Sequence, residues 1–210
     1  MVVESGPNIV DIYQIKVTLE GVHPLVWRRI QVPGDFTLRQ LHRVLQIAMG
    51  WEDCHLHKFV ADRQSYGRLG FLPELAMPTR GNENGSVAAR FEGQVGKVVF
   101  YEYDFGDLWV HALELEAISP AEPETEYPAC VAGARKCPPE DCGGPEGYEE
   151  LLGVLADESD PRHEELMEWV GPKFRSEAFS VEAVNEDLAE LRKRMARRRT
   201  ARSGGSSRVQ

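Results

Sequence analysis

The N-terminal part of the chain carries two stretches in which apolar and polar residues alternate. Between Ile12 and Leu19, the odd-numbered positions are apolar and positions 14, 16 and 18 are polar, which is the period of a half-buried strand. The alternation resumes from Val26 to Val32 after the interrupting segment GVHP, so the two stretches predict a hairpin. Arg28 falls in phase with the apolar face, and we expect its guanidinium to reach the rim of the sheet or to meet a carboxylate.

The next segment predicts an amphipathic helix that ends at Gly50. Thr37 followed by Gln40 is a capping-box signature, and apolar residues then recur at positions 38, 41, 44, 45, 48 and 49. The segment WEDCHLHKFV leads through a polar turn into a short strand. His55 and His57 are two residues apart and would lie on the same side of an extended chain.

The middle of the chain contains one uninformative stretch and one clear hairpin. Residues 62–96 have scattered Gly and Pro and predict a long irregular loop with one short helical turn, a kind of loop that is usually functional or mobile. Residues 97–118 alternate again around Phe-Gly-Asp. A two-residue turn at Gly106 and Asp107 would place Glu102 opposite His111. There the carboxylate would raise the imidazole pKa or orient its tautomer.

The C-terminal third predicts the end of the sheet, a cysteine-rich loop and three helices. The Pro-rich acidic connector SPAEPETEYP ends the predicted sheet and leads into residues 130–144, CVAGARKCPPEDCGG, here called the cysteine loop. Helices are predicted to open at Pro145, to span Glu164–Val170 and to run from a cap at Ser180 to Met195. We expect a flexible leader over residues 1–11, a single α+β domain over residues 12–195 and a disordered basic tail over residues 196–210.

Composition narrows the class of protein. Hydrophobic residues make up 42% and charged residues 28% of the 210 positions, which is typical of a globular protein. No apolar run approaches the length of a membrane span, and MVVESGPNIV lacks the basic and apolar regions of a secretion signal. We therefore expect a cytoplasmic protein without membrane contact. In that compartment the four cysteines are expected to be thiols or metal ligands rather than disulfides.

Charge is distributed unevenly along the chain, although the net charge is −10. Residues 192–210 contain eight basic and no acidic residues, so the other 191 residues carry 16 basic and all 34 acidic side chains. Such an acidic body would repel phosphate backbones, which leaves only the basic run for nucleic acid. The run from Arg192 to Arg202 either complements the dipole of the last helix or forms an arm that binds nucleic acid.

The cysteine loop is the first candidate metal site. Cys130, Cys137 and Cys142 are separated by six and four residues, whereas structural zinc sites usually keep two to four residues within each pair. A fourth zinc ligand would come from His111, His57, His55 or Cys54. The alternative is that these cysteines are buried or partly buried thiols in a loop shaped by its Gly and Pro residues.

A hydrolytic metal site is a second possibility. Its ligands would be His55, His57 and His111 with Asp104 or Asp107, and its base would be Glu102 or Glu140. Asp141 completes an acid pair beside Glu140. Against this, no HExxH pair is present, and two histidines at this spacing on a strand often line a sheet edge.

Five strings occur in an order that is similar to one known family. VHPLVWRRIQVP, LHRVLQIAMGW, HLHKF, YEYDFGDLWVH and YPACVAGARKCPPEDCGG resemble the plasmid pRi ORF-three-like family, also known as insertion-sequence passenger TnpR-family proteins, over about Tyr13 to Phe174. The resemblance implies an α+β roll, a curled and mostly antiparallel sheet packed on helices, and an association with plasmids and transposable elements. It implies no reaction. Cys142 stands where relatives often carry an apolar residue, which weakens a three-cysteine ligand set.

The sequence lacks the chemistry of a recombinase, although the name TnpR suggests one. Ser5 lies in an unpatterned leader without surrounding arginines, and the last tyrosine, Tyr148, opens a helix. GGPEGY lacks the lysine and preceding strand of a phosphate-binding loop. We therefore expect a non-catalytic binding or accessory module whose partner is a nucleic acid or a protein. The alternative is a zinc-dependent hydrolytic enzyme centred on His111, His57 and the cysteine loop. In either case we expect the hairpin at residues 97–118 and the cysteine loop to pack near residues 55–59.

Overall fold

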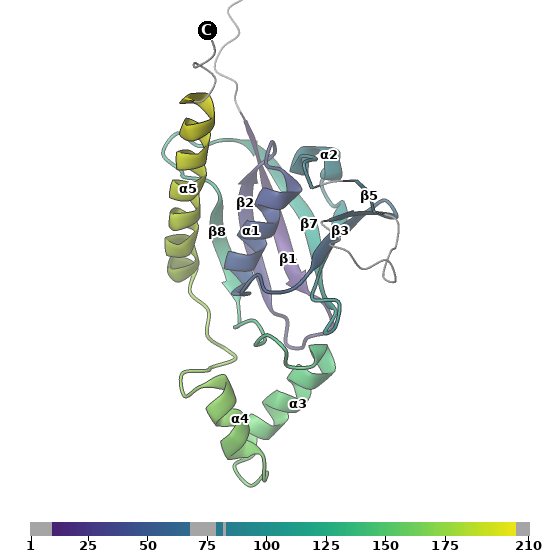
Figure 1. The fold of residues 1–210 in the computed structure, drawn as a ribbon, viewed down its shortest axis with the longest axis vertical. Coiled ribbons are helices and arrows are strands. Elements are labelled where there is room, and N and C mark those ends of the chain that lie inside the picture. The colour runs from purple at the N-terminus through teal and green to yellow at the C-terminus, as the bar shows by residue number, and fades with distance from the viewer. Residues whose placement is uncertain (1–9, 68–78, 82, 205–210) are drawn as a thin grey trace, which may run out of the picture.

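Residues 10–67, 79–81 and 83–204 are described by the computed structural model, and they form an α+β fold (Figure 1). Its centre is an eight-stranded sheet in the order β5-β4-β3-β6-β7-β1-β2-β8. Neighbouring strands pair antiparallel except β4 and β5, which pair parallel. The strands are β1 (Asp11–Leu19), β2 (Trp27–Pro33), β3 (His57–Ala61), β4 (Gln64–Gly67), β5 (Thr79–Gly81), β6 (Val98–Tyr103), β7 (Trp109–Pro120) and β8 (Ala129–Ala134).

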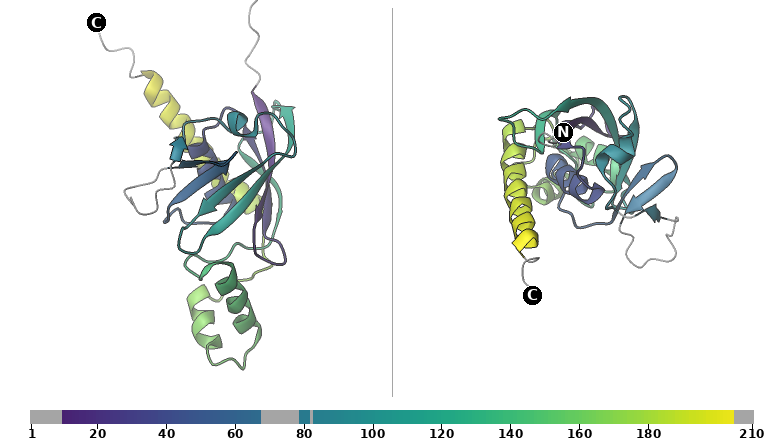
Figure 2. Two further views of the ribbon diagram at one scale, coloured as in Figure 1. Left: turned by 90° about the vertical axis from the view of Figure 1, so that its right-hand side faces the viewer. Right: turned by 90° about the horizontal axis from the view of Figure 1, so that it is seen from above.

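Five helices of the described residues cover the sheet or extend from it. They are α1 (Leu38–Met49), α2 (Val87–Phe91), α3 (Gly144–Ala156), α4 (His163–Val170) and α5 (Val181–Gly204). Figures 1 and 2 show α1 against one face of the curled sheet, α5 along the β8 side, and α3 and α4 beyond one end of the sheet. This arrangement confirms the predicted fold class. No helix among the described residues has the length and apolar character needed to cross a membrane.

The first hairpin and α1 form as their patterns predict. In β1 and β2, Tyr13 pairs with Val32 and Ile15 with Ile30, and all four side chains are buried. Thr37 caps α1, because its N–H donates to Gln40 Oε1 (2.9 Å) and its Oγ1 accepts from Gln40 N (3.3 Å). Gly50 ends the helix at a φ of 95°. The chain then turns toward the end of the sheet where β6 meets β7.

The predicted register of the β6–β7 hairpin is wrong. Tyr101, not Glu102, pairs with His111, and Tyr103 pairs with Trp109. The connection is a five-residue loop from Asp104 to Leu108, closed by a hydrogen bond from Leu108 N to Asp104 O (2.7 Å). Both end residues have positive φ, 55° and 54°. The register therefore shifts by one residue and sends the Glu102 carboxylate to the opposite sheet face from His111, where it pairs with Lys58 (2.8 Å).

Three further segments differ from their predictions. The connector does not end the sheet, because residues 129–134 add β8 beside β2. Asn185 of α5 covers the outer edge of β8, bonding both Cys130 N and Cys130 O at 2.8 Å. The predicted loop at 62–96 contains β4, β5 and the short helix α2, while residues 68–78 and 82 lie outside the described residues. Helix α5 continues to Gly204, past its predicted end at Met195.

Arg28 neither reaches the rim of the sheet nor pairs with a carboxylate. The residue is 2% exposed, and its guanidinium donates to three backbone carbonyls: Nε to Ala48 O (2.7 Å), and Nη1 to Trp27 O and Ala134 O (both 2.8 Å). It also lies 4.1 Å from the ring centre of Phe179. Because Ala48 belongs to the last turn of α1 and Ala134 to β8, this one side chain joins the helix to the edge of the sheet.

Candidate functional site

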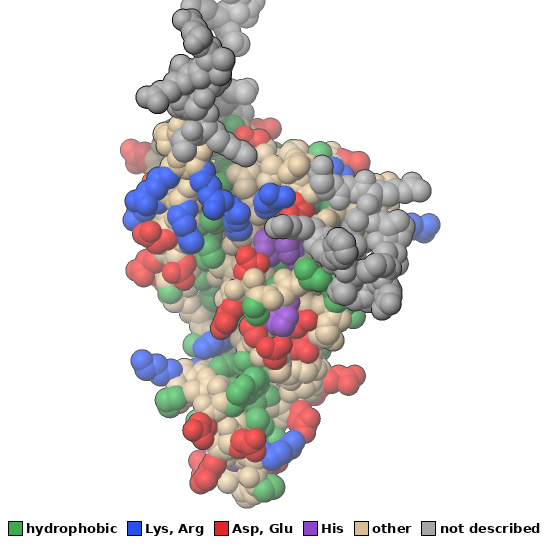
Figure 3. Space-filling view, viewed as in Figure 1, with side chains coloured by type: hydrophobic (Ala, Val, Ile, Leu, Met, Phe, Trp, Pro, Cys, Tyr) green, Lys and Arg blue, Asp and Glu red, His purple; other side chains and the backbone are tan. Residues whose placement is uncertain are grey.

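Three segments far apart in sequence meet at the end of the sheet that faces α3. His55 follows α1, Asp104 begins the β6–β7 loop, and Glu140 and Asp141 lie near the C-terminal end of the cysteine loop. His55 Nε2 lies 3.6 Å from Asp104 Oδ2, 3.7 Å from Glu140 Oε2 and 3.2 Å from Asp141 Oδ1. We call these four residues the histidine–carboxylate cluster. Figure 3 shows acidic side chains gathered around a histidine in this part of the surface.

Glu140 is held through one of its oxygens only. Glu140 Oε1 accepts hydrogen bonds from the Tyr103 hydroxyl (2.9 Å) and from Glu52 N (2.8 Å). Burial raises the pKa of Tyr103 far above its usual value, so the phenol stays protonated and donates. Among the described residues, Glu140 Oε2 and His55 Nε2 are buried without a hydrogen-bond partner, although the two atoms lie 3.7 Å apart and His55 Nε2 is 3.2 Å from Asp141 Oδ1. Buried polar atoms are usually satisfied, which makes this pair a candidate for binding a cation.

The distances in the cluster suit a metal ion. Two ligand atoms bound at about 2.0–2.2 Å to one tetrahedral ion lie about 3.3–3.6 Å apart. The three separations from His55 Nε2 fall close to that range. The ligand atoms of His55, Asp104 and Asp141 all lie within 4.8 Å of one another, as do those of Cys54, His55 and Glu140. His55 is therefore the shared ligand of two possible triads.

The carboxylates are positioned by a contact between the β6–β7 loop and the turn that opens α3. Asp107 Oδ2 accepts from Gly143 N (3.0 Å), and Asp104 Oδ1 accepts from Gly106 N (2.9 Å). Gly144 has a φ of 71°, and a Cβ at this position would lie 2.6 Å from the backbone oxygen of Asp107. Only glycine allows this close approach, so the CGG end of the cysteine loop serves to dock one acidic segment on the other.

Gly144→Ala is therefore expected to destabilise the protein by roughly 1–3 kcal/mol, because the left-handed backbone is costly for alanine and the new Cβ meets the Asp107 carbonyl. Gly153→Ala is the matched control in the same helix. A Cβ at Gly153 would meet no atom of the described residues within 4 Å, and alanine favours a helix interior. Thermal denaturation should show a lower melting temperature for G144A and an unchanged or higher one for G153A. Equal melting temperatures for the two variants would contradict the docking role.

His57 and His111 lie outside the cluster, in two other environments. His57 Nε2 is 2.7 Å from Glu83 Oε1, and its ring stacks on His42 with centroids 3.5 Å apart. His111 is fully buried, and its Nε2 accepts from Trp51 Nε1 (3.1 Å). Burial lowers the pKa of His111 to about 4. Neither histidine faces His55, although all three were predicted as ligands of one metal.

Among the described residues, the three cysteines of the cysteine loop are not grouped with other ligand atoms as closely as the members of the histidine–carboxylate cluster. Cys130 and Cys137 are buried, and burial raises the pKa of both thiols. Cys142 is half-buried, and its pKa is raised to about 12, by burial first and then by Asp107. Within the described part of the chain, no group of three ligand atoms within 4.8 Å includes any of them. The loop contributes its Glu140 and Asp141 carboxylates to the cluster instead.

Two cluster neighbours were not foreseen from the sequence in their present roles. Tyr103 was not among the sequence candidates, whereas its hydroxyl orients Glu140 and also accepts from Cys54 N (3.2 Å). Asp53, together with Gln46, extends the polar network around His42, whose Nε2 lies 2.8 Å from Asp53 Oδ1. The sequence signal for Tyr103 was its adjacency to Asp104, which places a buried phenol next to a carboxylate at a strand end.

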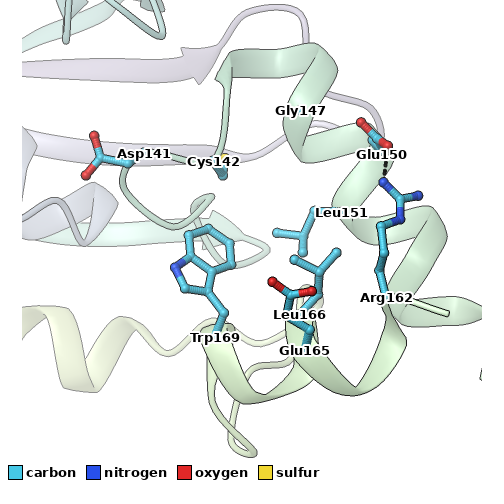
Figure 4. A pocket seen from close by; sticks show the side chains of 9 residues that line it. All are labelled: Asp141, Cys142, Gly147, Glu150, Leu151, Arg162, Glu165, Leu166 and Trp169. Carbon is cyan, nitrogen blue, oxygen red and sulfur yellow. Dashed lines mark hydrogen bonds and ion pairs between the residues drawn. The ribbon is translucent and has the colours of Figure 1, made fainter. Parts of the chain in front are cut away.

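A cavity of about 400 Å³ lies between α3 and α4 beside the cluster (Figure 4). Its apolar wall is Leu151, Leu166 and the half-exposed Trp169, and its rim carries Glu150, Arg162 and Glu165. Asp141 borders this cavity, but Figure 4 shows its carboxylate pointing away from Trp169. Asp141 thus belongs to the histidine–carboxylate cluster and also borders the cavity.

Fold and site together define an α+β protein with an open, mostly antiparallel sheet and a candidate cation site at one end of that sheet. The chain belongs to the plasmid pRiA4b ORF-3-like protein family, whose model matches residues 11–183. This confirms the resemblance found in the five sequence strings.

Two relatives support the assignment. The chain is 37% identical over 203 residues to the uncharacterized protein y4hQ of Sinorhizobium fredii, covering 91% of this chain and all of the relative. It is also similar to the crystal structure of MM3350 from Methanosarcina mazei Go1, a protein of unknown function, with a TM-score of 0.73 and 36% identity. That match covers 83% of this chain and 98% of the other. The fold is therefore shared with a solved structure over most of its length.

Proposed function

We propose that the protein is a metal-dependent hydrolytic enzyme whose divalent cation is bound by His55, Asp104 and Asp141. The observation that carries the proposal is the convergence of one imidazole nitrogen and three carboxylates, from three separate segments, at separations suited to one ion. The proposed ligands do not include His111, His57 or the three cysteines of the cysteine loop, on which the sequence centred the metal. An imidazole with carboxylates favours Zn²⁺ or Mn²⁺ over Mg²⁺.

The exposure of the ligands supports a catalytic rather than a structural ion. The Asp104 side chain is 10% exposed and Asp141 is 73% exposed, so one side of the site is enclosed and the other faces solvent. Catalytic metal sites keep such an open position for water, whereas structural sites are closed. A cation bound here would lower the pKa of its water. Glu140, fixed by Tyr103 and with Oε2 unpartnered, is placed to accept a proton from that water.

Cation binding is tested by titration calorimetry of chelator-treated protein with Zn²⁺, Mn²⁺ and Mg²⁺. We expect one ion per chain, and binding weakened by about tenfold or more in H55Q, D104N and D141N. Glu102→Gln, on the opposite sheet face, and Cys142→Ser are the controls and should bind as the unmodified protein does. Absence of stoichiometric binding of any of the three ions, or equal loss in E102Q, would refute the cation site.

Catalysis is tested with p-nitrophenyl esters of phosphate and acetate as general probes. Glu140→Gln should retain the ion within a few-fold while hydrolysis of the probe falls by about a hundredfold or more, which is the range of a general base. D104N should lose both. If the ion binds but neither the unmodified protein nor E140Q hydrolyses any probe in a cation-dependent manner, the enzymatic part of the proposal fails and the cation would have a binding role.

A second function, a non-catalytic accessory module of plasmids or transposable elements that binds a partner, is favoured by one observation. The C-terminal half of α5 carries arginines that form no ion pair with a described carboxylate, among them Arg194 and Arg198. Figure 3 shows Lys and Arg side chains gathered over this helix. Unpaired cations on a chain with a net charge of −10 support an anionic partner at this surface. Pull-down of nucleic acid with the full chain tests this function separately from cation binding.

A further inference from the structure

Two helices that are distant in sequence bring four arginines together. Helix α1 carries Arg39 and Arg43, and α5, which packs against α1, carries Arg194 and Arg198. A small cavity of about 150 Å³ opens between the two helices, lined by Arg43, Leu191, Arg194, Met195 and Arg198. We call Arg39, Arg43, Arg194 and Arg198 the arginine groove. Arginines and apolar side chains line the cavity together.

The charges of the arginine groove are poorly neutralised by the described part of the chain. Arg43, Arg194 and Arg198 form no ion pair with any described carboxylate, and Arg39 reaches Glu83 only at 3.4 Å. The pKa of the half-buried Arg43 is lowered by burial first and then by Arg198 and Arg39. Like charges held this close repel one another, so the fold keeps an unfavourable arrangement that an anion would relieve.

Helix dipoles do not account for these arginines. The dipole effect is confined to the last turn of a helix. Arg194 lies well before Gly204 at the end of α5, and Arg43 lies in the middle of α1. Their positions match the cavity between the helices and not the helix ends. Stabilisation of α5 through its dipole therefore does not explain why these arginines occupy their positions.

We propose that the arginine groove binds the phosphate groups of a nucleic-acid backbone. Within each helix the two arginines are four residues apart, which separates successive charges by about 6 Å along the axis. Two such rows suit a polyanion with regularly repeated charges better than a single small anion, and planar guanidinium groups suit phosphate oxygens. The inference rests on the second function proposed above and does not depend on the histidine–carboxylate cluster.

The acidic remainder of the chain limits how the nucleic acid approaches. The 191 residues before Arg192 carry 34 acidic side chains, so the polyanion is attracted only where arginines outnumber carboxylates. Binding is therefore expected to be weak, independent of base sequence and steeply dependent on salt. Arg43 of α1 takes part in this binding although it lies far from the C-terminal tail along the chain. Nucleic-acid binding is therefore not a property of that tail alone.

The test measures fluorescence anisotropy of labelled single-stranded and double-stranded DNA with the full chain, from about 50 to about 200 mM salt. Arg194→Gln with Arg198→Gln removes two groove charges. Lys193→Gln with Arg197→Gln removes two charges from another stripe of the same helix and is the matched control. R194Q/R198Q should weaken binding by about tenfold and reduce the slope of log K against log salt by about 2, because about one unit is lost per phosphate contact. K193Q/R197Q should change the affinity by less than about threefold, and Arg43→Gln should weaken it.

Several outcomes would overturn the proposal. These are no binding of either DNA at low salt, equal weakening by the two double variants, or unchanged binding in R43Q. Displacement of the DNA by pyrophosphate at a lower concentration than that of DNA phosphate would show a small-anion site and refute the nucleic-acid assignment. Asp104→Asn should bind DNA as the unmodified protein does, so that loss of the cation site and loss of the arginine groove are distinguished. Circular dichroism of each variant confirms that it is folded.

Discussion

Arg28→Leu is expected to destabilise the protein by roughly 3–5 kcal/mol, the largest effect of any single substitution considered. Arg28 is 2% exposed, and its guanidinium donates hydrogen bonds to the backbone carbonyls of Trp27, Ala48 and Ala134. Leucine supplies similar bulk but no donor, so three buried acceptors lose their partner. A buried acceptor left unsatisfied costs about 1–3 kcal/mol. Because the three carbonyls belong to different elements, the loss also loosens α1 and β8 from β2.

The neighbouring residue provides the control. Arg29 points to the opposite sheet face and pairs with the partly exposed Glu116, so Arg29→Leu should cost no more than about 1 kcal/mol. Arg28→Lys keeps the charge but loses the planar fork that reaches separate carbonyls, and it should lie between the two leucine variants. Urea unfolding at pH 7 measures all three. A cost for R28L no greater than that for R29L would show that the buried guanidinium contributes little.

The parts of the fold set by local pattern could be predicted from the sequence. The β1–β2 hairpin has a clear two-residue period, and α1 has both its capping box and its apolar stripe. The β6–β7 register could not be predicted, because its five-residue loop places the non-glycine residues Asp104 and Leu108 at positive φ. Glycine is the residue expected at positive φ in a turn, so the two-residue turn was placed at Gly106 and Asp107. The predicted strand pairing was therefore wrong by one residue.

Strand β8 was missed for a different reason. The segment ACVAGA has small residues and no alternation, so nothing local marks it as a strand. Its conformation comes from pairing with β2 and from the Asn185 side chain that covers its outer edge. Both partners lie far away in sequence. Local periodicity cannot predict a strand whose conformation depends on pairing with residues distant in sequence.

The members of the histidine–carboxylate cluster were all among the sequence candidates, but their grouping was not. His55, Asp104 and Glu140 were named as possible ligands or bases and Asp141 as part of an acid pair, while the predicted metal was centred on Cys130, Cys137 and Cys142. Residue type can identify groups capable of binding a metal. It cannot tell which of them face one another, since that depends on how the β6–β7 loop docks on the turn before α3.

Acid is expected to destabilise the protein through His111. Its pKa is lowered by burial from 6.5 to about 4 in the folded protein, whereas the unfolded chain titrates near 6.5. Between these values the unfolded state binds more protons, so stability falls as the pH falls. The contribution is fully present above about pH 6.5. About 2 kcal/mol of it is lost between pH 7 and pH 5, and roughly 3 kcal/mol by pH 4. His42, whose pKa is also lowered by burial, acts in the same direction.

His111→Gln isolates this contribution, because the amide can still accept from the Trp51 indole N–H but does not titrate. The variant should be less stable than the unmodified protein at pH 7, yet lose about 2 kcal/mol less on going to pH 5. Leu113→Val, in the same strand, destabilises by packing alone and should keep the full dependence on pH. Urea unfolding in the presence of a chelator at the two pH values measures the difference and removes any effect of bound metal. If H111Q and L113V lost the same stability between the two values, His111 would not be the source of the acid sensitivity, and its burial would have no thermodynamic consequence in this range.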